Sequence, residues 1–332
     1  MFSRVGSRLR LSHELGQVRG APGRSAQSRS GIAGAGARRQ ENGVSSAVDE
    51  ILAGREPGGH EQPAHHRYIV TVFGLYGRPA GKVIPVAALV RLLSELGYEP
   101  ASVRSSISRL KTKGVLASQK IGGANGYMLS SDLEPHMVAG DERIFCPRAA
   151  SIGDPWLLAS FSVPESERRK RHKIRAGLAR MGFGTVAPGL CIAPIRLRRE
   201  ALEYMREHDL ADYVEFFVSE PIGSGDLRAK VARWWNLDEL ASDYRAFLDA
   251  FEPEVARWTS LPPDGKEAQR EAFRLYVPMV TQWRRLPFLD PGLPPELLPS
   301  DWIGITARRV FADLNRVLKP MSERYVDEVI GA

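Results

Sequence analysis

Apolar residues recur at helical spacing after Pro100, where Val103, Ile107 and Leu110 fall at positions i, i+4 and i+7. Small polar residues and cations occupy the positions between them. Gly114 follows this pattern and is a typical residue for the end of a helix. The pattern therefore predicts a helix from Pro100 to about Gly114 with one buried face and one exposed face.

The segments on either side of this helix predict a hairpin and two further helices. Segments 115–120 and 127–129 flank the glycine-rich turn IGGANG and predict two paired strands. The apolar stretches RYIVTVFGLYG (67–77) and PVAALVRLLSELG (85–97) each predict a helix. Three helices followed by a hairpin are the elements of a winged helix-turn-helix, which we expect over residues 65–131.

The exposed face of the helix after Pro100 has a composition that suits a DNA groove. The guanidinium of Arg109 is able to bind two acceptors of guanine, and the short side chains of Ser105 and Ser108 let a helix lie deep in the groove. Other cations and serines beside them would bind phosphates. The residues expected to contact DNA are Ser102, Arg104, Ser105, Ser108, Arg109, Lys111, Lys113, Lys120 and Asn125. The alternative is a solvated helix face without a partner.

A second module, expected over residues 150–222, alternates between strand and helix patterns. The predicted elements are a strand at 155–164, a helix at 165–184, a strand region at 185–194, a helix at 198–210 and a strand at 213–221. The region 185–194 has room for one more strand. The resulting order, roughly β-α-β-α-β with this room for a further strand, predicts a ferredoxin-like α+β domain.

A third module, expected over residues 226–332, shows apolar residues at spacings of three and four, which predicts helices. Its last predicted helix runs from Trp302 to Leu318. The segment before that helix, residues 284–302, contains five prolines and many apolar residues. We therefore expect a rigid strap across the helices rather than a flexible linker. The helices are rich in aromatic residues, so we expect their surface to join two copies of the chain in a homodimer.

Positive charge is concentrated in two segments of a chain whose net charge is +7. Residues 1–40 contain eight Arg and one acid, and residues 66–131 contain nine Lys or Arg and two acids. Residues 41–63 and 132–332 are net acidic. A basic segment confined to the predicted winged helix indicates a polyanionic partner such as double-stranded DNA. Because residues 1–64 are rich in Gly, Ser, Ala and Arg, we expect a disordered basic arm and linker there.

The cysteine content and the hydropathy of the chain indicate the cellular compartment of the protein. The two cysteines, Cys146 and Cys191, argue against a disulfide framework and against a metal site made of paired cysteines. No segment approaches the ~18–20 apolar residues that a membrane-spanning helix needs. We therefore expect a cytoplasmic protein with no bound metal and no membrane association.

Three motifs occur in the order and spacing of a known family. They are VRSSISRLKTKGVL, RAGLARMGFGTVAPGLCIAP and, ahead of Trp302, RRLPFLDPGLPPELLP. From Arg67 to about Lys319 the chain resembles the PaaX-like (phenylacetic acid degradation repressor) transcriptional regulators. The resemblance implies an α+β multidomain fold with an N-terminal winged helix-turn-helix, a central ferredoxin-like domain similar to a small CRISPR-associated nuclease, and a C-terminal helical domain. It also implies a dimeric repressor of an aromatic-acid (phenylacetate-type) catabolic operon, released from operator DNA by an aryl-acyl-CoA such as phenylacetyl-CoA.

The densest basic run of the chain, ERRKRHK at 167–173, is the candidate binding site for this effector. Clustered Arg and Lys side chains suit the phosphates of coenzyme A. The candidate residues are Arg168, Arg169, Arg171 and Lys173. The alternative is the solvated outer face of a helix.

Catalysis finds little support in the sequence, and we expect neither catalytic residues nor a cofactor. The related nuclease fold holds a metal with an acid at the end of its first strand, but the corresponding segment here, LASFSVPES, contains no Asp. The motifs G-x-S-x-G, P-loop and H-E-x-x-H do not occur. The alternative function is a metal-dependent nuclease or an RNA-binding protein that uses the ferredoxin-like domain.

Overall fold

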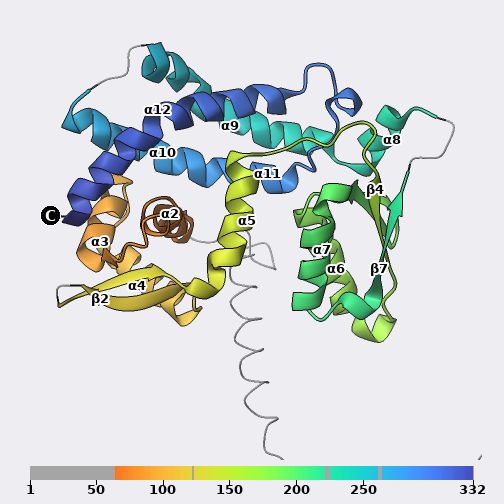
Figure 1. The fold of residues 1–332 in the computed structure, drawn as a ribbon, viewed down its shortest axis with the longest axis horizontal. Coiled ribbons are helices and arrows are strands. Elements are labelled where there is room, and N and C mark those ends of the chain that lie inside the picture. Colours follow the sequence, from red (N-terminus) through yellow and green to blue (C-terminus); the bar gives the residue numbers. More distant parts are fainter. Residues whose placement is uncertain (1–63, 122, 221–224, 261–263, 332) are drawn as a thin grey trace, which may run out of the picture. The chain divides into compact units, whose positions relative to one another are not determined.

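The computed structural model describes residues 64–121, 123–220, 225–260 and 264–331 (Figure 1). The basic arm and linker expected over residues 1–64 lie outside the described residues, apart from Ala64. None of the helices in the described ranges combines the length and the apolar content that crossing a membrane requires.

The first described part of the chain forms short helices and a small sheet. Its elements are α2 (Ala64–Val72), the π-helix η1 (Phe73–Gly77), β1 (Ile84–Pro85), α3 (Val86–Glu95), α4 (Pro100–Thr112), β2 (Leu116–Ile121) and β3 (Ala124–Leu129). The strands pair antiparallel in the order β1-β3-β2. The predicted helices and hairpin are present, but the turn is shorter than expected. Because Ile121 pairs with Ala124, Asn125 and Gly126 of the predicted turn belong to β3.

A helix that the apolar pattern did not predict follows this sheet. It is α5 (Glu134–Phe145), preceded by the short 3-10 helix η2 (Ser131–Leu133). Gly140 in its interior lowers its helix propensity. The helix is tied instead by long-range contacts, such as the hydrogen bond of 3.0 Å from Trp283 Nε1 to the Ile144 carbonyl. Tertiary contacts therefore specify α5 more than its local sequence does.

The central part of the chain forms a four-stranded antiparallel sheet packed against two helices. Its elements are β4 (Trp156–Phe161), η3 (Glu165–Glu167), α6 (Arg168–Arg180), β5 (Gly184–Ala187), β6 (Leu190–Pro194), η4 (Ile195–Leu197), α7 (Arg198–Glu207), η5 (Ala211–Tyr213) and β7 (Val214–Ser219). The strand order is β5-β6-β4-β7. The region 185–194 thus contains β6 and most of β5, so the further strand for which it had room is present. They join at Gly189, whose φ of 77° favours glycine.

The last part of the chain is helical. Its elements are α8 (Leu227–Trp234), α9 (Leu237–Ser260), α10 (Lys266–Trp283), α11 (Leu286–Leu289), η6 (Pro295–Leu297) and α12 (Ile303–Gly331). Helix α12 packs along both α9 and α10 (Figure 1).

The prediction that the last helix ends at Leu318 was wrong. Helix α12 continues through Pro320 to Gly331. A proline inside a helix removes one backbone donor. Beyond it, however, Tyr325 and Val329 continue the buried stripe of the helix. Burial of this apolar surface outweighs the lost hydrogen bond.

The N-terminal and C-terminal helices share one hydrophobic core, whereas the central sheet forms a second core with α6 and α7. Two buried hydrogen bonds join the ends of the chain inside the shared core. One links Tyr76 Oη and Ser322 Oγ at 2.5 Å. The other links Thr71 Oγ1 and Thr281 Oγ1 at 2.8 Å. The N-terminal and C-terminal segments therefore pack as one body.

The aromatic residues of the C-terminal helices fill this core. Trp258, Trp283 and Trp302 are all buried. Trp283 stacks on Phe311 with ring centroids 4.5 Å apart. Because these rings are used inside the protein, the aromatic content of the helices is explained by the core, and the dimer surface expected on them stays a prediction.

The proline-rich strap contacts helices on both sides, as predicted. Asp290 Oδ2 accepts hydrogen bonds of 2.7 Å from Tyr244 of α9 and from Arg308 of α12. The other carboxylate oxygen of Asp290 accepts a bond of 2.7 Å from the Gly292 N–H. Gly292 has a φ of 62°, and a Cβ there would lie 2.9 Å from the Arg148 carbonyl oxygen. Both the backbone conformation and this close approach require glycine.

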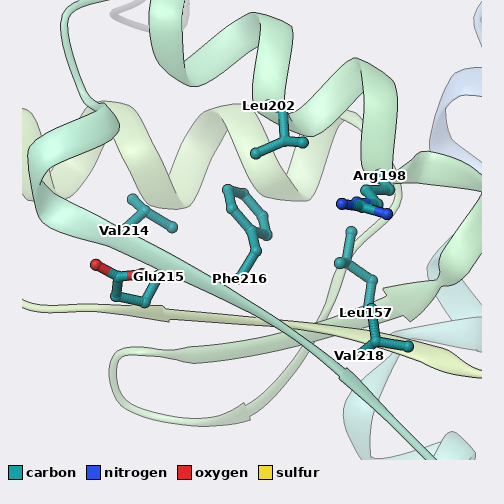
Figure 2. Close-up of a pocket in the computed structure, with 7 residues that line it drawn as sticks. All are labelled: Leu157, Arg198, Leu202, Val214, Glu215, Phe216 and Val218. Atoms are coloured by element: carbon teal, nitrogen blue, oxygen red, sulfur yellow. The ribbon is translucent and has the colours of Figure 1, made fainter.

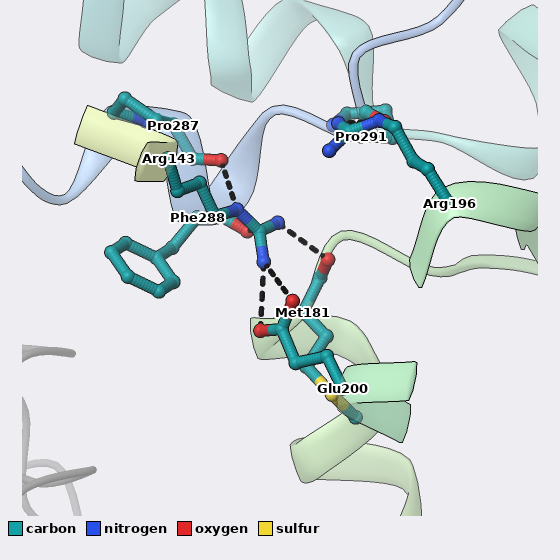
Figure 3. A network of polar contacts seen from close by, with 7 residues as sticks. All are labelled: Arg143, Met181, Arg196, Glu200, Pro287, Phe288 and Pro291. Atoms are coloured by element: carbon teal, nitrogen blue, oxygen red, sulfur yellow. Dashed lines mark hydrogen bonds and ion pairs between the residues drawn. The ribbon is translucent and has the colours of Figure 1, made fainter. Parts of the chain in front are cut away.

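A buried arginine near the end of α5 joins the strap to the central sheet and its helices (Figure 3). The Arg143 guanidinium donates to both carboxylate oxygens of Glu200 in α7, at 2.8 and 2.7 Å, and to the Met181 carbonyl at 2.8 Å. It also donates to the carbonyls of Pro287 at 2.7 Å and Phe288 at 3.1 Å. Burial lowers the pKa of Arg143, and the ion pair with Glu200 opposes this effect. The side chain thus has hydrogen-bond partners from three segments of the chain.

We predict that Arg143→Ala destabilises the protein by about 3–5 kcal/mol, because it leaves Glu200 and three backbone carbonyls without their donor. Urea unfolding followed by circular dichroism measures this loss. The control Lys266→Ala removes an ion pair with Glu328 whose side chains are both exposed, and should cost at most about 1 kcal/mol. Equal losses in the two variants would contradict the role assigned to Arg143.

Candidate nucleic-acid interface

Helix α4 is anchored by its apolar stripe and exposes the opposite face. Val103, Ile107 and Leu110 are buried, as their spacing predicts. Pro100 occupies the first turn, where its missing N–H has no helical acceptor. Gly114 follows the helix with a φ of 74°, which ends it and directs the chain into β2. Contacts with α2 and α3 then fix the orientation of the exposed face.

All nine residues predicted to contact DNA are exposed. Those on α4 are Ser102, Arg104, Ser105, Ser108, Arg109 and Lys111, and the others are Lys113 just after α4, Lys120 on β2 and Asn125 on β3. Lys120 and Asn125 are direct partners across the hairpin, so their side chains lie on the same face. The structure thus brings six of the residues together on one helix and two others to the end of the hairpin.

The cations of α4 are available to an anionic partner. Within the described ranges, Arg104, Arg109 and Lys111 form no ion pair with a carboxylate. The acid nearest to them in the sequence, Glu99, precedes the first turn of the helix. Positive side chains gathered on one exposed face raise the local potential and attract a polyanion.

A pair of histidines at the start of α2 lies close to the end of α4, a proximity that the sequence did not indicate. Burial, followed by the charges of His65, Arg109 and Lys113, lowers the pKa of His66 to about 4. The His66 side chain is therefore neutral near pH 7. The positive charge of this surface comes from its arginines and lysines.

The candidate effector residues lie on α6, but the structure does not gather all of them at one site. Arg168, Arg169, Arg171 and Lys173 are all exposed. Arg171 turns back to Glu165, at 3.1 Å, and to the Val163 carbonyl, at 2.6 Å. In the described part of the chain, Arg168 and Arg169 form no ion pair. These two are the better candidates for binding phosphate.

The central module also has a groove between α7 and β7, with a cavity volume of about 250 Å³ (Figure 2). The side chains of Leu202 and Phe216 approach each other across it, and Arg198 lies at one end. The charged side chains of its lining are Arg198 and Glu215, and the rest of the lining is apolar.

The part of the chain that the structure describes contains no candidate metal-binding site. No group of three or more His, Cys, Asp or Glu side chains is placed there to hold an ion. Strand β4, Trp156–Phe161, contains no acidic residue. A metal-dependent nuclease would need such ligands.

Comparisons with known proteins give one consistent result. Sequence models of three PaaX domains match the chain in order: PaaX-like protein at residues 65–133, the PaaX protein central Cas2-like domain at 149–231, and the PaaX-like protein C-terminal domain at 235–328. A curated relative, the transcriptional repressor PaaX of Escherichia coli strain K12, is 28% identical over 257 residues, which is 75% of this chain and 78% of that protein.

One solved structure has a similar fold. It is the uncharacterized protein Rv0674 from Mycobacterium tuberculosis, with a TM-score of 0.52 and 21% identity, covering 79% of this chain and 96% of that one. This likeness concerns the fold alone. The three domain matches together extend over most of the described residues, and the chain belongs to the PaaX-like protein family.

Proposed function

We propose that this protein is a sequence-specific DNA-binding transcriptional repressor. Residues 65–131 would form a winged helix-turn-helix that places α4 in the major groove, with the β2–β3 hairpin as the wing. One observation carries the proposal: the exposed face of α4 presents serines and cations opposite a buried apolar stripe. The similarity to a transcriptional repressor supports it.

The proposal also assigns a fold to each of the other two modules of the chain. The strand order β5-β6-β4-β7 supports a ferredoxin-like domain over residues 150–222, and residues 226–332 would form the helical domain. We infer a cytoplasmic repressor of an aromatic-acid operon of the phenylacetate type. The alternative, a metal-dependent nuclease or RNA-binding protein, is not favoured because the family relationship is to a repressor and not to an enzyme.

We predict that Arg104→Ala and Arg109→Ala each weaken operator binding by about 1–3 kcal/mol, because each removes a guanidinium from the face proposed to enter the groove. Fluorescence anisotropy with labelled operator DNA measures the affinity. The control Arg245→Ala removes an exposed arginine from α9 and should leave the affinity unchanged. A result in which neither α4 variant differs from this control would refute the placement of α4.

A homodimer is part of the proposal, and we propose strand β7 as the surface that forms it. Strand β7 is at an edge of the central sheet and pairs only with β4 among the described strands. Its side chains Phe217 and Val218 are 53% and 57% exposed. An unpaired strand edge with exposed apolar residues is a template for another strand. Two β7 strands related by a twofold axis would satisfy both edges, and two winged helices would then read an inverted repeat.

We predict that the wild-type protein is a dimer at micromolar concentration and that Phe217→Lys makes it a monomer, because a charge on the edge strand opposes strand pairing. Light scattering measures the mass. The control Ile305→Lys alters an equally exposed apolar residue on α12 and should remain a dimer. A monomeric wild-type protein, with and without DNA, would exclude the dimer, and a dimeric Phe217→Lys variant would exclude this surface.

The proposed effector is an aryl-acyl-CoA such as phenylacetyl-CoA, without any other cofactor. A ligand shifts an equilibrium only through its different affinities for the two states. Coenzyme A offers phosphates, amides and adenine from which such a difference is built, whereas a free aryl acid offers one ring and one carboxylate. The phosphates would bind the Arg168–Lys173 run, where Arg168 and Arg169 are the most available residues.

We predict that phenylacetyl-CoA weakens operator binding by about 5- to 150-fold, while phenylacetate has no effect at the same concentration. Calorimetry and operator anisotropy with both compounds compare them directly. Equal effects of the thioester and the free acid, or no effect of either, would show that the effector class is wrong.

A further inference from the structure

An isoleucine is exposed at the far end of the β2–β3 hairpin. Ile121 is the last residue of β2 and pairs with Ala124, the first residue of β3. The Ile121 side chain is 47% exposed, because the residue opposite it on the hairpin is too small to cover it. The largest apolar side chain of this end of the hairpin is therefore available to a partner outside the chain.

Pairing with β1 holds the hairpin in a fixed orientation. Strand β1 pairs with β3 at Tyr127 and Gly126. A Cβ on Gly126 would lie 2.5 Å from Val83 Cγ1 and 3.1 Å from the Ile84 carbonyl oxygen, so this close approach requires glycine. Two residue pairs lie beyond Gly126 and extend the hairpin by about 7 Å past its last pairing with β1. The end of the hairpin thus projects from a rigid base.

Both faces of this projecting end meet solvent. Ile121 and Ala124 lie on one face, and the pair Lys120 and Asn125 lies on the other. All four residues are exposed. This end of the hairpin points away from α4 (Figure 1). It therefore presents one apolar side chain on one face and a cation with an amide on the other.

The charge of this segment favours a polyanion as the partner of the hairpin. From Pro100 to Ser131 the sequence contains five Lys or Arg and no Asp or Glu. The hairpin also moves as one unit with α4, since the Val115 N–H donates to the Leu110 carbonyl at 2.9 Å where the helix ends. An apolar residue at the end of a basic hairpin suits a partner that has phosphates at its rim and apolar surface inside. The minor groove of DNA has this composition.

We propose that the end of the hairpin enters the minor groove beside the major groove that receives α4, and that Ile121 is an apolar wedge that bends the DNA there. The inference deepens the proposed function and rests on it. Minor-groove proteins insert apolar side chains such as isoleucine between base steps and kink the duplex by about 20–90°. The groove is only about 6 Å wide, and the small Ala124 lets the hairpin approach it closely. Lys120 would then contact the phosphates at its rim.

Such a wedge would determine specificity at base pairs that α4 does not touch. The energy of a kink depends on how easily the base step unstacks, and pyrimidine–purine steps unstack most readily. The hairpin would therefore favour operators that have a flexible step beside the site of α4. Ile121 would contribute to the choice of operator without a hydrogen bond to any base.

The test uses the full chain and a DNA duplex that the wild-type protein selects from a random pool. Ile121→Ala removes the wedge, and the control Ile152→Ala trims an isoleucine that is 50% exposed outside the DNA-binding segment. We expect Ile121→Ala to bind the duplex at least about fourfold more weakly, the factor for one buried methylene. It should also bend the duplex less, as measured by energy transfer between dyes at the two ends. Ile152→Ala should match the wild type in both measurements.

A second measurement changes the DNA, so that it does not depend on the folding of a variant. Duplexes with G·C or inosine·C at the base pairs beside the α4 site differ by the 2-amino group in the minor groove and share the same major-groove acceptors. We expect the wild type to bind the inosine duplex more tightly, because the amino group obstructs the wedge. Ile121→Ala should distinguish the two duplexes less than the wild type does.

The outcomes separate the wedge from the repressor. Equal affinity and equal bending in Ile121→Ala and Ile152→Ala would overturn the wedge and leave the repressor in place, as would a wild type that selects a duplex without bending it. A wild type that does not distinguish the inosine duplex would overturn the minor-groove contact. A change of mass in Ile121→Ala with normal bending would assign the isoleucine to a protein contact instead. Failure to select any duplex would refute the repressor and the wedge with it.

Discussion

The burial of α2 and η1 against α10 and α12 is the contact on which the other surfaces depend. Ile69 and Phe73 from the first helices and Phe273 and Val326 from the last ones are fully buried in one core. Each such side chain contributes about 1.5–3 kcal/mol when it leaves water, which exceeds the contribution of a typical surface ion pair. Since α4 packs on α2 and α3, this core also determines which face of α4 meets solvent.

The central sheet is attached to that body differently. Besides the contacts of Arg143, the indole of Trp235 donates to the Gly182 carbonyl at 2.8 Å. A Cβ on Gly184 would lie 2.7 Å from the same indole, so this strand is adapted to the ring. Trp156 of β4 and Ile192 of β6 also belong to the larger hydrophobic core, so both polar and apolar contacts fix the position of the sheet. The hydrogen bonds of Arg143 and Trp235 make this attachment specific in geometry.

The spacing of apolar residues along the sequence identified the helices with a regular apolar stripe. It failed for helices whose existence or length depends on tertiary contacts. The stripe of Val103 and Leu110 in α4 was predictable because it depends on local sequence alone. Helix α5 and the part of α12 beyond Pro320 were not, since their stability comes from segments far away in the chain. Predictions from charge had the same limit. The basic run on α6 made Arg171 a candidate phosphate ligand, but its ion pair with Glu165 depends on how the segment before α6 folds, which the sequence pattern does not indicate.

The hydrogen bond between Tyr76 and Ser322 joins residues that are 246 positions apart. During synthesis on the ribosome, the first helices emerge long before α12 exists, and long-range contacts of this kind form late in folding. The N-terminal segment therefore has an incomplete core until translation is almost finished. A chain cut short before residue 303 would contain every residue of α2, α3 and α4 but lack α12, which completes the core that α3 and η1 share with it. The first folded elements of the chain therefore depend for their full burial on the last one.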